Sequence, residues 1–77
     1  MNSEQANALL WEIKDAVTAL RRRNARPHVI MIDASLHKKF ELGLDCGPVL
    51  SVSKVPLCVV ENFRPGWLVQ RFTGGVQ

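Results

Sequence analysis

The chain has 77 residues, which suits one small domain and is too short for two. Its two cysteines, Cys46 and Cys58, are too few for a disulfide scaffold, and its apolar content of 47% excludes a chain that is disordered throughout. The net charge of +3 and the pI near 9.3 are mildly basic and weakly favour an anionic partner.

The sequence does not predict export or membrane insertion. The first ten residues lack a positive segment and contain Glu4, so we do not expect a secretory signal. No apolar run approaches the roughly 18 residues that a membrane span needs. We therefore expect a soluble protein of the cytoplasm, with reduced thiols and without a membrane partner. A core this small often gains stability by oligomerising or by docking on a partner.

Residues 3–24 have the apolar spacing of an amphipathic helix. Apolar side chains recur at three- and four-residue steps and form one stripe, which contains Ala6, Leu10, Ile13, Val17 and Leu20 and is widened by Leu9 and Ala16. Asn2 or Ser3 can cap the start of this helix, and Pro27 stops it. The stripe packs either on the sheet of the same chain or against a second copy or a neighbouring protein, and the sequence leaves both open. Trp11 lies off the stripe, which favours a contact wider than core packing.

A strand and a second helix follow Pro27. Residues 28–32, with the sequence HVIMI, predict a short buried strand. Asp33 then caps a helix over residues 34–42, and Gly43 is a natural helix stop. The predicted helix has an apolar and a solvated face, formed by Leu36 and Phe40 and by Lys38, Lys39 and Glu41, respectively.

The remaining sequence predicts three strands. Residues 46–48, Cys-Gly-Pro, make a turn, and residues 49–53 mix apolar and polar positions as in a half-buried strand. Residues 55–60 and 67–72 are two apolar strands, which we expect to pair as a hairpin around the Pro-Gly turn at 65–66.

The order of helix, strand, helix and three strands predicts an α+β fold, β-α-β-β-β after an N-terminal amphipathic helix. The helices are expected on one face of a small, mostly antiparallel sheet. No internal repeat or linker divides the chain, so we expect a single domain over residues 1–77. Within it, residues 1–26 hold the helix that is a candidate for oligomerisation, residues 27–72 form the α/β core, and residues 73–77 form a frayed, Gly-rich tail.

The sequence carries no catalytic or metal-binding pattern. The available metal ligands are His28, His37, Cys46 and Cys58, and neighbours among them are at least nine residues apart, whereas zinc sites use pairs at closer spacing. Cys58 lies in an apolar strand, where a free cysteine behaves as a small hydrophobe, and nothing orients a histidine toward Cys46. Paired carboxylates, phosphate-binding glycine loops and nucleophile elbows are missing as well. We expect a non-enzyme without cofactor, metal or small-molecule substrate.

A cluster of arginines at the end of the first helix is the candidate anion-binding site. It consists of Arg21, Arg22, Arg23 and Arg26, with Lys38 and Lys39 as a second basic pair. Such a cluster can neutralise phosphates and give salt-dependent binding. Cations also belong at the C-terminal end of a helix, where they complement its dipole, and no nucleic-acid-binding motif accompanies them. Nucleic acid is therefore an alternative partner rather than the expected one.

The helix stripe and the aromatic residues near the Pro-Gly turn form the candidate protein interface. Tryptophan and arginine are enriched among the residues that dominate binding energy at interfaces. Phe63 and Arg64 are expected at a loop tip, and Phe63 and Trp67 either close the end of the core or form a binding surface. The candidate interface residues are Leu10, Trp11, Ile13, Val17, Leu20, Phe63, Arg64 and Trp67.

The segment PHVIMIDASLHKKFELG resembles the strand–helix segment in the axial domain of tailed-phage major capsid proteins. In that family a glycine turn and a strand hairpin with a Pro-Gly turn follow, and VPLCVVENFRPGWLVQRF is similar to that pattern. The resemblance covers residues 27–72, and small phage and prophage proteins carry the same segment behind an N-terminal helix. Two features depart from the family: the long arm and spine helix of a capsid subunit are absent, and Ala34 stands where the pattern has proline.

The resemblance implies a phage origin, a fold of the axial-domain type, and a location in the host cytoplasm or in the virion. We expect a non-enzymatic phage accessory protein that acts by protein–protein contact, as a minor virion component, a head or tail accessory protein or an assembly factor. Its partner would be a second copy, a phage protein or a host protein. The alternative is a host-targeting binding module, which inhibits a host defence or regulatory protein or binds nucleic acid weakly through the cluster from Arg21 to Arg26.

Overall fold

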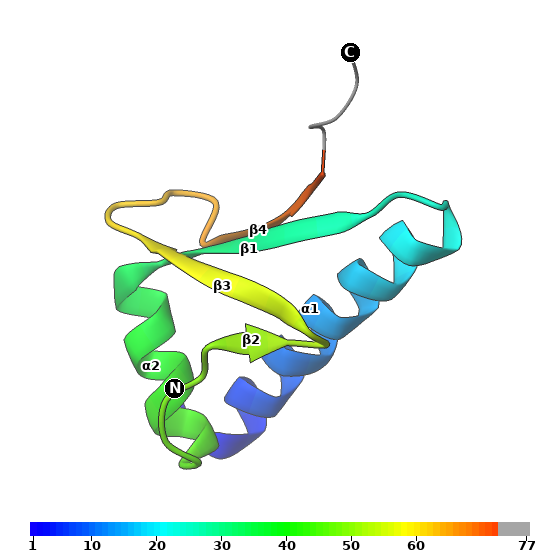
Figure 1. The fold of residues 1–77 in the computed structure, drawn as a ribbon. Coiled ribbons are helices and arrows are strands. Elements are labelled where there is room, and N and C mark those ends of the chain that lie inside the picture. The colour runs from blue at the N-terminus through cyan, green and yellow to red at the C-terminus, as the bar shows by residue number, and fades with distance from the viewer. Residues whose placement is uncertain (73–77) are drawn as a thin grey trace.

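The computed structural model describes residues 1–72 and shows two helices on one side of a four-stranded sheet (Figure 1). In chain order the elements are α1 (Ser3–Arg22), β1 (Pro27–Asp33), α2 (Ala34–Leu44), β2 (Ser51–Val52), β3 (Val55–Val60) and β4 (Trp67–Arg71). This order confirms the predicted α+β fold. The predicted tail at residues 73–77 lies outside the described residues.

β1 is a central strand of the sheet, whose order is β2-β3-β1-β4. It pairs in parallel with β3 and antiparallel with β4, and β2 pairs antiparallel with β3, so the sheet is mixed and mostly antiparallel, as predicted. The expected hairpin of residues 55–60 with 67–72 is wrong, because β1 lies between these strands. Strands that flank a third strand are roughly 10 Å apart, which is too far for a tight turn. The loop at residues 61–66 spans this distance instead.

The core lies between the sheet and the helices. It consists of Ala6, Leu9, Ile13, Val17, Ile30, Ile32, Phe40, Val52 and Val55. The apolar stripe of α1 therefore packs on the chain's own sheet, which is one of the two arrangements that the sequence left open. The strand predicted as buried at 28–32 is buried on one side only, since Val29 and Met31 are half-buried.

Both ends of α1 have hydrogen-bonded caps. Asn2 and Gln5 form a capping box, in which each side chain accepts a hydrogen bond from the other residue's backbone N–H, at 2.8 and 3.0 Å. At the C-terminal end, Asn24 has a positive φ of 59° and the Ala25 N–H donates to the Leu20 carbonyl oxygen, as in a Schellman motif. This conformation at Asn24 ends the helix earlier than predicted.

Helix α2 continues past its predicted stop at Gly43. This glycine is buried where the two helices meet: a Cβ atom built on it would lie 2.6 Å from the Ala6 Cβ and 3.0 Å from the Asn2 carbonyl oxygen. Gly43 therefore permits close helix packing and does not terminate the helix. The C-cap is Asp45, which adopts the left-handed conformation with a φ of 53°.

The strand predicted at residues 49–53 is reduced to the two residues of β2, because α2 binds the backbone before it. Glu41 Oε2 accepts the Val49 N–H at 2.7 Å, and His37 Nε2 lies 3.0 Å from the Val49 carbonyl oxygen. The expectation that Glu41 is solvated was wrong, since this contact leaves its side chain half-buried.

A tight turn joins β2 to β3 and makes the local hairpin of the sheet. Its central residues, Ser53 and Lys54, both have positive φ, of 51° and 69°, as in a type I′ turn. Arg21 Nη2 donates to the Ser53 carbonyl oxygen at 2.8 Å, which ties the end of α1 to this turn.

Asp33 joins the end of β1, the start of α2 and the loop before β4. Its Oδ2 accepts the backbone N–H groups of Ser35 and Leu36, at 3.1 and 3.2 Å, which confirms the predicted N-cap. Its Oδ1 accepts the Phe63 N–H at 2.9 Å, and its own N–H donates to the Gly66 carbonyl oxygen at 2.7 Å. The side chain and the backbone of Asp33 together thus fix the loop that carries the chain across β1.

Candidate interaction surfaces

The predicted interface residues of α1 do not share one surface. Ile13 and Val17 are completely buried in the chain's own core, so they are not accessible to a second protein. The half-buried members on this helix are Leu10 and Leu20. Trp11 is 61% exposed, and the Lys14 Nζ lies 4.9 Å from the centre of a Trp11 ring. Trp11 is therefore the predicted α1 residue that remains open to a partner.

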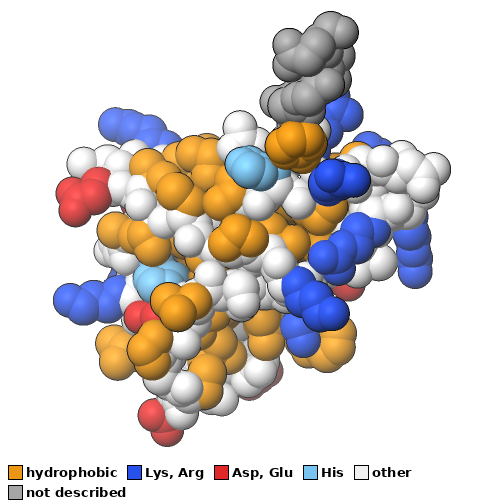
Figure 2. All heavy atoms as spheres, in the orientation of Figure 1, with side chains coloured by type: hydrophobic (Ala, Val, Ile, Leu, Met, Phe, Trp, Pro, Cys, Tyr) orange, Lys and Arg blue, Asp and Glu red, His pale blue; other side chains and the backbone are white. Residues whose placement is uncertain are grey.

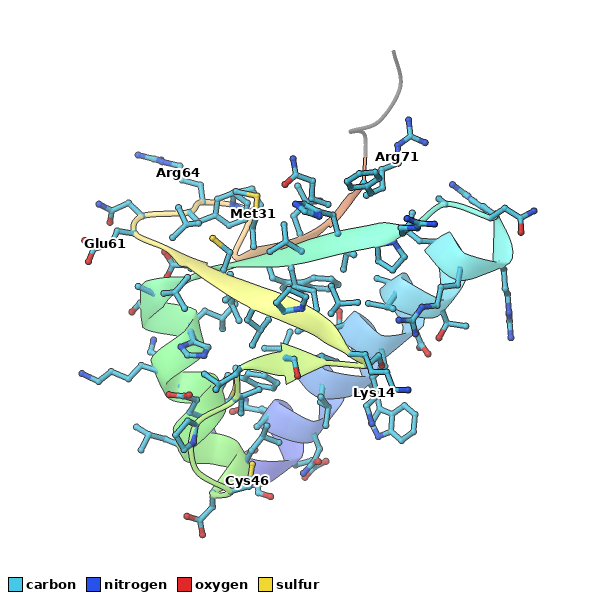
Figure 3. All side chains as sticks on the ribbon, in the orientation of Figure 1. Lys14, Met31, Cys46, Glu61, Arg64 and Arg71 are labelled. Atoms are coloured by element: carbon cyan, nitrogen blue, oxygen red, sulfur yellow. The ribbon has the colours of Figure 1, made fainter. Side chains whose placement is uncertain are left out.

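The three predicted interface residues near β4 have different environments. Phe63 is half-buried, and Arg64 is exposed on the loop beside β3 (Figure 3). Trp67 is half-buried and packs against the core, so it serves the fold, and its role in binding stays a prediction. Gly66 has the predicted positive φ, of 88°, although the hydrogen bond from its N–H to the Phe63 carbonyl oxygen places the turn one residue earlier than expected.

Alternation along the strands gives the sheet two faces. The side chains that face the helices belong to the core or pack against it, and they come from Ile30, Ile32, Val55, Leu57, Trp67 and Val69. Between them, Met31 lies opposite Cys58 on one side and Leu68 on the other, and these three side chains point away from the helices. We call this side the outer face; its members are Val29, Met31, Pro56, Cys58, Val60, Leu68 and Gln70.

The outer face is apolar apart from Gln70, and the polar Ser51 lies opposite Pro56 at its β2 edge; neither helix covers this face (Figure 1). Leu68 is 50% exposed, and Pro56 and Cys58 are exposed as well. Figure 3 shows Met31 on the side of the sheet away from the helices, and Figure 2 shows hydrophobic side chains gathered over the sheet in the same view. Contiguous apolar surface of this kind marks a site of interaction on a small protein.

An open hollow of about 390 Å³ lies where the end of α1, the start of β1 and the β2–β3 turn meet. We call it the basic hollow; it is lined by Arg21, Asn24, Ala25, Arg26, Pro27, His28, Lys54, Val55 and Pro56. The lining contains the cations of Arg21, Arg26 and Lys54 and no acidic side chain. Figure 2 shows several Lys and Arg side chains gathered at this end of the molecule. Pro56 belongs to both surfaces, so the basic hollow borders the outer face.

The predicted arginine cluster is divided by the fold. Arg21 and Arg26 line the basic hollow, and Arg21 is also bound to the β2–β3 turn. The arginines outside the lining are Arg22 and Arg23, which are exposed. Lys54 completes the hollow; the sequence did not predict it as a member, because the hairpin brings it to the cluster from far along the chain. The Arg26 guanidinium lies 5.9 Å from the centre of the Phe72 ring.

The histidines and cysteines that were considered as metal ligands lie apart. Among residues 1–72 no three His, Cys, Asp or Glu side chains gather where they could hold a metal ion. Cys46 and Cys58 are both free and exposed, Cys58 because it lies on the outer face. The His37 ring contacts Val49 and lies 3.4 Å from Glu41. Neither helix described here has the length and apolar content needed to cross a membrane.

Comparison of the chain with protein-family models, with curated proteins and with solved structures found no match in any of the three. The resemblance to the phage capsid segment, and the phage origin that it implies, therefore stay predictions. The strand hairpin that belongs to this resemblance is not formed. Function is consequently inferred from the outer face and the basic hollow.

Proposed function

We propose that this protein is a small contact module that binds another protein through the outer face of its sheet. The observation that carries this proposal is the apolar composition of a face that no helix within residues 1–72 covers. A sheet with helices on one side commonly presents polar side chains on the other, so an apolar second face needs a partner. The resemblance of residues 27–72 to a capsid segment supports a role as an accessory protein in phage assembly.

The basic hollow adds a charge preference to this contact. It adjoins the outer face at Pro56, with Arg26 and Lys54 in its lining. A partner that fits both surfaces has an apolar centre and an acidic border. Complementary charge at the border of an interface increases the association rate and selects among partners of similar shape.

Substitution of one outer-face leucine tests the proposal. Leu68→Glu introduces a charge on the outer face, while Leu42→Glu makes the same change on α2, where Leu42 is 74% exposed. The proteins would be immobilised, exposed to extracts of the cells that make this protein, and the retained proteins identified by mass spectrometry. We expect wild type and Leu42→Glu to retain the same partner and Leu68→Glu to lose it, with unchanged circular dichroism.

Retention of every bound protein by Leu68→Glu would contradict the proposal. So would equal loss with both glutamate variants, because that result would indicate a general effect of charge. An apolar centre and an acidic border predict two results. High salt should release only part of the partner from wild type, whereas Leu68→Glu should not bind it at all.

A second candidate function is binding of nucleic-acid phosphates in the basic hollow. The observation that favours it is the convergence of Arg21, Arg26 and Lys54 from two distant parts of the chain, with no carboxylate in the lining. Phosphate contacts give an affinity that falls as the salt concentration rises. The hollow is open, as a site for an extended polyanion must be.

A pair of double variants tests the second candidate. Arg26→Glu with Lys54→Glu changes the basic hollow, and Arg22→Glu with Arg23→Glu makes the same change in charge outside it. Fluorescence anisotropy with labelled oligonucleotides over a salt series should show that the hollow variant binds weakly, with roughly two fewer ions released. Equal losses in the two variants would show that only general charge matters.

A further inference from the structure

β4 has one open edge. Among the strands described, it pairs with β1 alone. The Asp33 N–H of β1 donates to the Gly66 carbonyl oxygen, so the backbone of Gly66 faces β1. In the same register, the backbone groups of Leu68 and Gln70 also face β1. Inward and outward groups alternate along an antiparallel strand. The N–H and C=O groups of Trp67, Val69 and Arg71 therefore point away from β1.

This edge lacks the features that usually protect an exposed strand. Short strands, prolines, lysines and bulges normally prevent an edge from pairing with another chain. β4 is five residues long and reads WLVQR, whereas β2 at the other edge of the sheet has two residues. The register shift between β1 and β4 lies in β1, between Pro27 and Val29. β4 thus presents a regular edge with a single charge, at Arg71.

We propose that the open edge of β4 pairs antiparallel with β4 of a second copy, about a two-fold axis at Val69. The pairing goes beyond the proposed function, because it uses a strand edge in place of the outer face and names a second copy of the chain as the partner. In this register Val69 lies opposite itself, and Trp67 lies opposite the partner's Arg71. All outward backbone groups of the strand are then paired, in about six hydrogen bonds.

The sequence of the edge favours this register over its neighbours. An axis at Leu68 would place Arg71 opposite the partner's Pro65, which has no N–H to donate. An axis at Gln70 would leave Trp67 opposite a residue beyond the strand. With the axis at Val69, an aromatic ring faces a guanidinium, a pair that cation–π attraction and cross-strand packing both favour.

A second copy of the chain is the expected partner, because the edge of β4 can pair with an identical strand. Trp67 and Arg71 stand at equal distances on either side of Val69, so one strand contains both halves of each contact. Pairing joins the two sheets into one, with the helices of both copies on the same side and the two outer faces continuous. One strand per copy makes a contact smaller than the roughly 1,600 Å² of a standard interface, so we expect dimerisation to depend on protein concentration.

Substitution at Arg71 tests the pairing. Arg71→Pro removes an outward N–H from an exposed residue and leaves the inward groups of β4 in place, so the fold should survive. Arg71→Ala keeps the N–H and removes the cation. Light scattering over a concentration series should give wild type a mass approaching twice the 8.6 kDa of the chain, at low and at high salt. Arg71→Pro should remain monomeric with unchanged circular dichroism, and Arg71→Ala should dimerise more weakly than wild type.

Cysteine cross-linking tests the register. With the axis at Val69, Leu68 lies opposite the partner's Gln70 in a pair without direct hydrogen bonds, whose Cα atoms are roughly 4.5 Å apart. This distance lies within the range for a disulfide. Leu68→Cys with Gln70→Cys, made in a background where Cys46 and Cys58 are serine, should give a cross-linked dimer on oxidation. Leu68→Cys alone should cross-link poorly, because residue 68 of one copy is diagonal to residue 68 of the other, with a separation of roughly 7–8 Å.

Two results would overturn the pairing: a wild-type monomer at every concentration, or a dimer that Arg71→Pro leaves intact. A dimer that Leu68→Glu abolishes and Arg71→Pro spares would also overturn it, because the copies would then meet through their outer faces. If the wild type is monomeric and still captures a partner that Leu68→Glu loses, the edge pairing fails while the contact function stands. Suppose instead that Arg71→Pro loses the dimer, Leu68→Glu keeps it, and Leu68→Glu captures the same proteins as wild type. The edge pairing would then be supported, and binding through the outer face would be contradicted.

Discussion

Gly43 is a residue that must be small, because helix α1 packs closely against it. Alanine is the better helix former by about 1 kcal/mol, so helix propensity alone would make Gly43→Ala stabilising. The new Cβ would lie 2.6 Å from the Ala6 Cβ and 3.0 Å from a backbone oxygen, so the two helices would have to separate. We expect a net loss of about 1–2 kcal/mol in the free energy of unfolding, measured by urea denaturation.

A double variant separates this clash from other effects of the added methyl group. Ala6→Gly removes the nearest of the contacting atoms, at the cost of helix propensity in α1. If the contact is responsible, the two substitutions should be less destabilising together than the sum of their separate effects. Additive losses would show that the Ala6–Gly43 contact does not limit the packing of the helices.

At the scale of elements, the β2–β3 hairpin contains a correctable strain. Ser53 and Lys54 both have positive φ, a conformation that Asn-Gly adopts most readily in this kind of turn. Ser53→Asn with Lys54→Gly should raise the free energy of unfolding by about 1 kcal/mol. The Arg21 bond should persist, since it goes to a backbone oxygen. Ser51→Asn, in the adjoining strand, should give no gain, and a destabilised double variant would contradict the assignment of the turn.

The sequence predicted those parts of the elements that depend on neighbours along the chain. The stripe of α1, the cap at Asp33 and the choice of Asn2 or Ser3 as the cap of α1 were predicted because periodicity and capping are local; the structure selects Asn2. The partner of β4 was not, because the Pro-Gly pair specifies a turn without specifying which strand the chain pairs with afterwards. The sequence predicts a helix stop at Gly43, because it does not show that another helix approaches this residue.

The candidate surfaces were predictable to a smaller extent. Four arginines close together in sequence indicated a basic cluster, but two of them lie outside the basic hollow and Lys54 joins it from the β2–β3 turn. The alternation of residues in β1 and β4 does not predict the outer face, because the sequence does not show that Met31 lies beside Leu68. The stripe on α1 left open whether it packs on the chain's own sheet or on a partner, and the structure places Ile13 and Val17 in the core.

At the scale of the whole molecule, a domain of this size has a thin margin of stability, and association would add to it. If folded copies pair through β4, the apparent melting temperature of the wild type should rise with protein concentration, because only the folded state dimerises. Arg71→Pro should melt at one temperature throughout the series, and Arg71→Ala should show a smaller rise. Circular dichroism at several concentrations provides the measurement, and a concentration-independent wild type would contradict this expectation.

The position of β1 between β3 and β4 also has a consequence for synthesis of the chain. A hairpin can form as soon as its two strands exist, but β1 receives its neighbours only from later segments. Its parallel partner, with Leu57 opposite Ile30, is made after α2, and β4 is made later still. Until residues 67–71 have been translated, the central strand has an unpaired flank of apolar sequence. Completion of the sheet therefore waits for the C-terminal part of the chain, and a chain in which β4 has not yet paired exposes an apolar flank that favours misassembly.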